Sequence, residues 1–327
     1  MRAVVCHTFG PLSQLMAEER ESPPITSGQV RIEVAAAGVN FVDGLFVLGL
    51  YQTKPPLPFV PGSEIAGRVT EVAPGVSTVA VGDRVFANIR LGGFASEVLV
   101  AATRVRRTPD TMTDGQAATF TQSYMTAYFA LAHRAGARSG QTLLVLGAGS
   151  GVGLAAVDVG SALGLRVIAA ASTSDKRELA RSRGADSIID SATEDIKRRA
   201  RDFAGGDGVD LVYDPVGGVQ AEQALRTLRE DGQFLVIGFA SGTIPRLPAN
   251  QILLRNRRVT GVEWGPWASR EIVANNAFLD DVLARIERGE LQPVEPIAYP
   301  IGEAARAIQD QLERRVTGKA ILLPEPL

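Results

Sequence analysis

The chain has 327 residues and a mass of 34.6 kDa, which is long for one hydrophobic core and predicts two domains. Its formal charge of −2 offers no overall attraction to nucleic acid or to an anionic membrane. A single cysteine, Cys6, excludes an internal disulfide and a zinc site built from several thiolates of one chain. Because residues 2–5 already have the pattern of a first strand, no secretory leader is expected. We expect a cytoplasmic protein without a membrane partner or strong nucleic-acid binding.

The chain up to about Pro109 has the pattern of an irregular β domain. Residues 30–34 alternate between apolar and polar side chains, and residues 65–72 are rich in β-forming types. A tight turn at 81–83 precedes a further strand. Thr113 then begins a run that is typical of a helix N-cap, so a helix is expected to lead toward the next domain.

Residues 142–170 carry the most informative pattern in the chain. A short apolar strand at 142–146 runs into a turn with glycines at positions 147, 149, 151 and 153, and a helix over 154–163 leads to a second strand at 166–170. Glycines in such a turn let a pyrophosphate approach the backbone and let the helix pack close to the strand. The first N–H groups of the helix then bind the phosphates. The pattern predicts a dinucleotide site, with the register of the turn left open because the spacing departs from G-x-G-x-x-G.

The residues after the second strand indicate which nicotinamide coenzyme is used. Coenzymes without a 2′-phosphate are usually held by an Asp or Glu at the end of that strand, and none stands there. The chain instead has hydroxyl side chains from Ser172 onward, followed by Lys176 and Arg177. A cation on a phosphate favours NADPH over NADH. The alternative is that both cations are solvated in the first turn of the next helix, close to Asp175.

Strand and helix patterns continue to alternate after residue 170, which predicts a parallel, doubly wound sheet. From about Val259 the sequence pattern is mixed, and a helix and a final strand are also expected in that part of the chain. The expected elements are helices over 176–183, 194–203, 221–228 and 272–288, and strands over 187–189, 209–213, 233–237 and 320–323.

Seven segments, in family order, resemble the medium-chain dehydrogenase/reductase superfamily and, within it, the zinc-free NADPH:quinone oxidoreductase group that includes zeta-crystallin. The segments are Ala37–Asp43, Pro58–Glu64, Val81–Val85, Gly151–Leu154, Val212–Gly218, Ile237–Gly242 and Gly318–Ala320. The resemblance implies an α/β protein in which a Rossmann doubly wound parallel sheet is inserted into a GroES-like β-rich catalytic domain. The implied boundaries are 1–118 for the first catalytic part, 119–258 for the NADP-binding domain and 259–327 for the returning segment.

The resemblance also separates this chain from zinc-dependent alcohol dehydrogenases. Zinc enzymes of the superfamily have a Cys where this chain has Asn40, and a His where it has Ser63. Neither replacement is a useful zinc ligand, and Glu64 cannot form a three-ligand site alone. Without such a Lewis acid, NADPH-dependent hydride addition to a quinone or an α,β-unsaturated carbonyl is the favoured reaction.

Matched position by position, the resemblance places Asn40 and Tyr51 in the acceptor pocket as catalytic residues. It implies NADP(H) as the cofactor, held by Thr126, Gly149, Ser150, Gly151, Val152, Ser172, Lys176, Gly238, Phe239, Ala240, Ser241, Arg314 and Lys319. No residue is expected to bind a metal. Some relatives have a cofactor-holding Tyr after the third strand, which is absent here, so a lower NADPH affinity is expected. A second pocket Tyr of some relatives corresponds to Leu45, so a more apolar acceptor is expected. The resemblance also implies a homodimer in which residues 259–262 extend the sheet.

Several alternatives stay open at this point. Asn40 could cap a turn, and Tyr51 could pack as loop core beside prolines. The enzyme could reduce enoyl thioesters, or it could be a zinc-independent alcohol dehydrogenase. It could also be a nucleotide-binding protein with a non-enzymatic, RNA-binding or structural role.

Overall fold

The computed structural model describes residues 1–324, and the chain divides into two compact units. Unit 1 consists of Met1–Gln122 and the segment from Val294 onward, and unit 2 consists of Ser123–Pro293. No helix among residues 1–324 is long and apolar enough to cross a lipid bilayer.

The return from unit 2 to unit 1 lies later than the sequence predicted. The expected boundary was residue 259, but the segment up to Pro293 packs within unit 2. The reason is aromatic packing, because the Trp267 ring stacks on Phe278 at 5.5 Å and lies 4.6 Å from Phe129. The backbone N–H of Gln292 also donates to Asp158 Oδ2 at 2.7 Å, which fixes the end of this segment.

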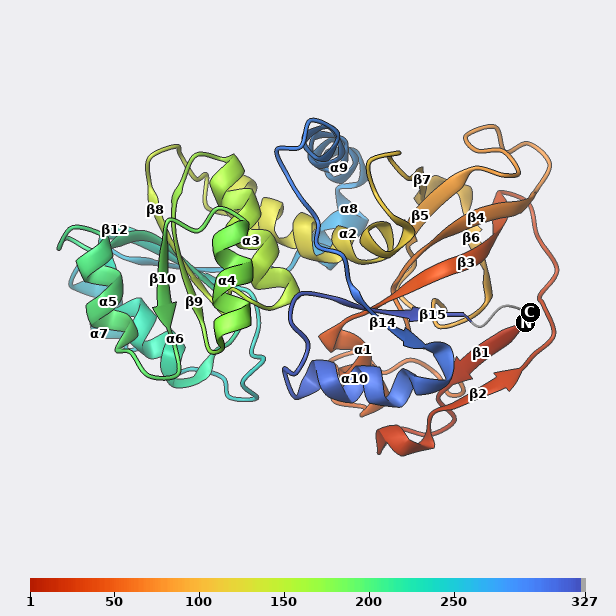
Figure 1. The fold of residues 1–327 in the computed structure, drawn as a ribbon, viewed down its shortest axis with the longest axis horizontal. Helices are drawn as coiled ribbons and strands as arrows, with labels where there is room; N and C mark the ends of the chain where they lie inside the picture. The colour runs from red at the N-terminus through yellow and green to blue at the C-terminus, as the bar shows by residue number, and fades with distance from the viewer. Residues whose placement is uncertain (325–327) are drawn as a thin grey trace. The chain divides into compact units, whose positions relative to one another are not determined.

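Unit 1 contains a seven-stranded, largely antiparallel sheet in the order β14-β15-β3-β4-β5-β7, with β6 paired to β3 (Figure 1). The first two strands, β1 and β2, form a separate antiparallel pair. The helix α1 contacts α10, which joins the two parts of the chain within this unit. The strands are β1 (Arg2–Val5), β2 (Met16–Glu19), β3 (Gln29–Val39), β4 (Glu64–Val72), β5 (Arg84–Asn88), β6 (Glu97–Ala101), β7 (Val105–Arg107), β14 (Ile297–Pro300) and β15 (Ala320–Leu323). The helices are α1 (Phe41–Val47), α10 (Ala304–Leu312) and the short 3₁₀ segments Leu12–Gln14, Ala102–Arg104 and Ile301–Glu303.

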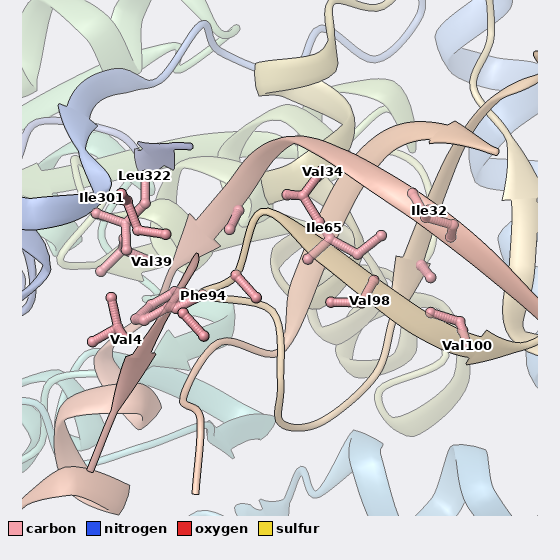
Figure 2. Close-up of a cluster of buried hydrophobic side chains, with 14 of the residues drawn as sticks. Val4, Ile32, Val34, Val39, Ile65, Phe94, Val98, Val100, Ile301 and Leu322 are labelled. Atoms are coloured by element: carbon pink, nitrogen blue, oxygen red, sulfur yellow. The ribbon is translucent and has the colours of Figure 1, made fainter. Parts of the chain in front are cut away.

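The core of unit 1 lies between these strands (Figure 2). Ile32, Val34 and Val39 come from β3, and Leu322 comes from β15. Pairing of β15 with β3 therefore brings the last described strand into the same core as the first part of the chain. The periodicity that predicted this β domain is confirmed by the burial of alternate β3 residues.

The helix α2 (Asp114–Tyr128) begins where its N-cap sequence predicted. Thr113 Oγ1 accepts from the backbone N–H of Gln116 at 3.1 Å, and Gln116 Oε1 accepts from the N–H of Thr113 at 3.0 Å. This reciprocal pair is a capping box, which satisfies two N–H groups that the helix leaves without internal partners. A π-helical turn, Phe129–Arg134, follows the helix directly.

Unit 2 is built on a six-stranded sheet in the order β10-β9-β8-β11-β12-β13, in which every pairing is parallel. The first strand of the unit, β8, lies between β9 and β11, so the chain winds outward in both directions. This confirms the doubly wound sheet. The strands are β8 (Thr142–Leu146), β9 (Arg166–Ala171), β10 (Ser187–Asp190), β11 (Val209–Asp214), β12 (Leu228–Val236) and β13 (Arg258–Gly261). The helices are α3 (Gly151–Ala162), α4 (Ser174–Ser182), α5 (Ile196–Phe203), α6 (Gly218–Leu225), α7 (Ala249–Leu253), α8 (Trp264–Arg270) and α9 (Ile272–Glu287).

Helices α3 and α4 each lie against the strands before and after them, with α3 contacting β8 and β9 and α4 contacting β9 and β10 (Figure 1). Strand β13 is the last in the sheet order, and its Val259 is 39% exposed. The predicted edge strand is confirmed, whereas the homodimer built on it stays a prediction.

Candidate functional site

The glycine-rich turn after β8 is held by the residue that caps α3. Ser150 Oγ accepts from the N–H of Gly153 at 3.3 Å and donates to the carbonyl oxygen of Gly147 at 2.7 Å. A Cβ added at Gly153 would overlap that same carbonyl oxygen and lie 2.8 Å from the carbonyl carbon. Only glycine therefore lets the first turn of α3 sit this close to the strand end. The predicted contacts Gly149 to Val152 form the N-terminal end of this helix, where unpaired N–H groups bind anions.

The base of the Lys176 side chain lies against Gly149 of the glycine-rich turn. A Cβ at Gly149 would overlap the Lys176 side chain, so the missing side chain makes room for this lysine. Thr173 Oγ1 accepts from the N–H of Lys176 at 3.4 Å and caps α4, which holds the lysine in the first helical turn. The neighbouring Arg177 instead forms an ion pair with Asp190 at 3.0 Å. Ser172 is exposed between the strand end and the cap.

The loops that follow β11 and β12 lie beside the glycine-rich turn. A Cβ at Gly147 would lie 2.8 Å from Val216 Cγ2, which places the β8 and β11 loops in contact. The backbone N–H of Ser241 donates to the Val216 carbonyl oxygen at 2.8 Å, and that of Ala240 donates to the Pro215 carbonyl at 3.0 Å. Residues 238–241 are thereby brought to the same carboxyl edge of the sheet, next to the point where the strand order reverses. Crevices at such points bind nucleotides in doubly wound folds.

Asp214 holds the β11 loop in place, a role that the sequence reasoning did not foresee. Its Oδ1 accepts from the N–H groups of Val216 and Gly217 at 2.8 and 2.9 Å, and the residue is fully buried. Burial raises the pKa of this carboxyl, while the two N–H donors act in the opposite direction.

Unit 1 contains a buried polar network centred on Asn40. The Lys319 ammonium donates to Asn40 Oδ1 at 2.7 Å, and Asn40 Nδ2 donates to Glu64 Oε2 at 2.8 Å. Asn40 is 7% exposed, Lys319 5% and Glu64 1%. An ammonium only donates and a carboxylate only accepts. Only one orientation of the Asn40 amide therefore satisfies both, with its oxygen toward Lys319 and its nitrogen toward Glu64. Reversing the amide would give up two charge-assisted hydrogen bonds of about 1.5–3 kcal/mol each.

Asp43 is a second buried carboxyl beside this network. Its Oδ2 accepts from the backbone N–H of Asn40 at 2.7 Å, and Oδ1 has no hydrogen-bond partner among the described residues. Burial raises the pKa of Asp43 to about 7; the N–H of Asn40 and the Lys319 ammonium oppose that rise, and the charge of Glu64 adds to it. Burial also lowers the pKa of Lys319, while the charges of Glu64 and Asp43 raise it. The network thus holds one cation and two carboxyl groups away from water.

Three further predicted residues lie on or next to helices: Tyr51 follows α1, Thr126 is on α2 and Arg314 follows α10. Tyr51 packs its ring 4.5 Å from that of Phe46, and its backbone N–H donates to the Leu45 carbonyl. Arg314 lies in the turn after α10 with a φ of 59°, and Thr126 is half-buried on α2. Sequence reasoning considered Glu64 only as a metal ligand and gave Asp43 no role. Both lie in segments that carried the family resemblance, but their contacts with Asn40 depend on tertiary pairing.

A glycine-rich phosphate turn on a doubly wound sheet, joined to a separate antiparallel β unit, defines a dinucleotide-binding dehydrogenase or reductase. Residues 26–120 match the alcohol dehydrogenase GroES-like domain, and residues 151–279 match the zinc-binding dehydrogenase family. The chain belongs to the quinone oxidoreductase group of the medium-chain dehydrogenase/reductase superfamily.

Three similar proteins illustrate this membership. A quinone oxidoreductase-like protein 2 homolog from Nematostella vectensis is 35% identical, and the match covers 98% of this chain and 88% of the relative. Escherichia coli quinone oxidoreductase complexed with NADPH has a TM-score of 0.89 at 27% identity, covering 99% of this chain and 100% of that one. Quinone oxidoreductase from Thermus thermophilus, also solved with NADPH, has a TM-score of 0.85 at 34% identity, with 99% and 100% covered.

The name of the second family raises the question of whether zinc fits this chain. The Asn40 oxygen already accepts from an ammonium cation, and Ser63 Oγ donates to Gln122 Oε1 at 3.3 Å. Glu64 is taken by Asn40 and by the N–H of Gln122 at 2.7 Å. Within residues 1–324, no three His, Cys, Asp or Glu side chains are grouped to hold a metal ion. A neutral amide and a hydroxyl beside a fixed cation do not fit a catalytic zinc site.

Proposed function

We propose that this oxidoreductase uses NADPH to reduce a quinone or an α,β-unsaturated carbonyl compound without zinc. The observation that carries the proposal is the buried Lys319 ammonium on Asn40, at a position where zinc enzymes of the superfamily have a cysteine ligand. A fixed cation and its oriented amide can stabilise negative charge on an acceptor oxygen, as a metal does in the zinc enzymes.

The residues of unit 2 fit NADPH as the coenzyme. The α3 N-terminus would hold the pyrophosphate, and Ser172 and Lys176 would hold the 2′-phosphate, with no carboxylate between Ser172 and Ser174 to repel it. Residues 238–241 and Thr126 would contact the nicotinamide half. When bound, the reduced nicotinamide supplies the hydride.

Replacing Lys176 with alanine is expected to raise the Kd for NADPH about ten- to hundredfold and to leave the Kd for NADH nearly unchanged. The physical reason is the loss of one charge-assisted hydrogen bond to the 2′-phosphate. Fluorescence titration of the reduced coenzymes measures both constants. Lys197→Ala, which removes a lysine from α5, is the matched control. An unchanged NADPH constant in a folded Lys176→Ala protein would disprove the phosphate contact.

In this proposal the chain's own residues orient the acceptor and stabilise the charge that develops on it. An N–H of Asn40 donates to the acceptor oxygen, and the Tyr51 hydroxyl is the second candidate donor. The proton that completes the reduced product comes from solvent, because neither donor gives up its proton. Reduction by hydride and proton then balances without another redox partner.

We expect simple quinones or enones to be reduced rapidly with NADPH as the hydride donor. The same reduction is expected to be much slower with NADH. A spectrophotometric screen of quinones, enones and enoyl thioesters with both coenzymes measures acceptor class and coenzyme choice together. Turnover confined to enoyl thioesters would favour the acyl-thioester reductase alternative. Tight, salt-sensitive RNA binding with no turnover would favour the non-enzymatic role.

A further inference from the structure

The Asn40 amide has one hydrogen-bonding group that the network does not use. An amide nitrogen carries two hydrogens and an amide oxygen accepts. The oxygen is bonded to Lys319, and one N–H is bonded to Glu64. The described residues offer no acceptor for the second N–H, although Asn40 keeps 7% of its surface exposed.

We propose that Lys319 is a positioning residue that, together with Glu64, fixes and polarises the Asn40 amide so that its second N–H donates to the acceptor oxygen. This inference rests on the proposed function of the same site. It gives Lys319 a role in the acceptor site, in place of the coenzyme contact that the family resemblance implied.

The geometry supports action through Asn40. The Lys319 ammonium lies 2.7 Å from Asn40 Oδ1 and 4.0 Å from Glu64 Oε2, and the residue is 5% exposed. A cation on the amide oxygen withdraws electron density from the nitrogen, which makes the remaining N–H a stronger donor. The carboxylate of Glu64 on the other N–H prevents rotation of the amide. The donor is therefore set before an acceptor binds, which is the condition for efficient stabilisation of an oxyanion.

The buried charges of Lys319 and Glu64 also hold Asn40 in one arrangement. Lys319 directly precedes β15 and Glu64 is the first residue of β4; these two strands lie on opposite sides of β3, and Asn40 follows the end of β3. Glu64 is further held by the N–H of Gln122 at 2.7 Å. A buried pair of this kind adds little stability compared with apolar side chains of similar volume, but it specifies one arrangement of the groups between its charges.

The test measures binding of a phenolate, p-nitrophenolate, whose anionic oxygen imitates a reduced quinone. Its absorbance is titrated with protein saturated with NADP⁺, and the Kd for NADPH is measured separately by fluorescence. Lys319→Met is expected to weaken phenolate binding about tenfold or more, with little change in the NADPH constant. Lys319→Arg retains a cation and a donor and is expected to recover most of the affinity. Lys176→Met should show the opposite pattern, with weaker NADPH binding and unchanged phenolate binding.

A double-mutant cycle establishes whether Lys319 acts through Asn40. In an Asn40→Ala background, Lys319→Met is expected to cause no further loss of phenolate binding, because the amide that it polarises is gone. Additive losses would overturn the inference. If Lys319→Met does not fold because Glu64 loses its cation, the Lys319→Met/Glu64→Gln double variant removes both charges and takes its place in each measurement.

The outcomes separate the inference from the proposed function. Three outcomes would each overturn the positioning role of Lys319. They are unaltered phenolate binding by Lys319→Met, a loss in that variant confined to NADPH binding, and no phenolate binding by the parent protein. The expected binding pattern, in a protein that reduces no quinone or enone, would support the network and refute the proposed reaction. Turnover of quinones, with no effect of Lys319→Met on phenolate binding, would support the proposed reaction and refute the positioning role of Lys319.

Discussion

Gly153→Ala is expected to lower the free energy of unfolding by about 1–3 kcal/mol and to weaken NADPH binding more than about tenfold. The added Cβ would overlap the carbonyl oxygen of Gly147 and lie 2.8 Å from its carbon, so the backbone of the turn has to move. That same carbonyl accepts from Ser150 Oγ, and Ser150 caps α3, so the movement disturbs the helix end that binds phosphate. Urea denaturation and coenzyme titration measure the two effects.

Gly265→Ala is the matched control for this substitution. Gly265 is also a helical glycine, in α8, and an added Cβ there would have no heavy atom within 4 Å. Alanine at Gly265 is expected to be neutral or slightly stabilising, since it restricts the unfolded chain. Equal stabilities and equal coenzyme constants for the two variants would show that close packing at Gly153 is not what shapes the phosphate turn.

The sequence predicted the nucleotide unit well because its signals are local. Periodicity, glycine position and helix caps determine β8, α3 and β9 within a few residues, and Thr113 caps α2 as expected. The predicted element boundaries were wrong where contacts between distant segments determine the structure. Residues 226–228 were expected to end a helix, but Leu228 instead begins β12, where it pairs with Val209. The returning segment was misplaced because the aromatic side chains of α8 and α9 have a packing partner that no local pattern reveals.

The candidate site was predictable in part for the same reason. Gly149 and Lys176 lie within one helix-strand-helix segment, α3 to α4, whose elements local patterns predict. Asn40 and Lys319 are 279 residues apart, and only the pairing of β15 with β3 brings them to one place. The resemblance identified both residues, but it could not give the hydrogen bond between them or the participation of Glu64. Chemistry that depends on such long-range pairs has to be derived from the structure.

The second large effect concerns pH, and it arises from Asp43. Burial, with a smaller contribution from the charge of Glu64, raises the pKa of Asp43 from 3.8 to about 7 in the folded chain. The folded state therefore binds the proton of the Asp43 carboxyl more tightly than the unfolded state does. Well below pH 3.8 Asp43 is protonated in both states and the stabilising effect is complete. As the pH rises from about 4 to 7 the unfolded chain ionises first, and this contribution is lost, amounting to about 4 kcal/mol at most.

Asp43→Asn is expected to remove this part of the pH dependence, because asparagine keeps an oxygen that can accept from the Asn40 N–H and has no proton to lose. Urea denaturation at several pH values between 4 and 8 should give a stability difference, variant minus parent, that increases with pH up to about 7 and then stays level. Burial also raises the pKa of Asp158 and Asp214, but these groups are common to both proteins and cancel in the difference. Parallel stability profiles for the two proteins would mean that Asp43 is ionised throughout this range, so that the buried network holds two negative charges against the one ammonium of Lys319.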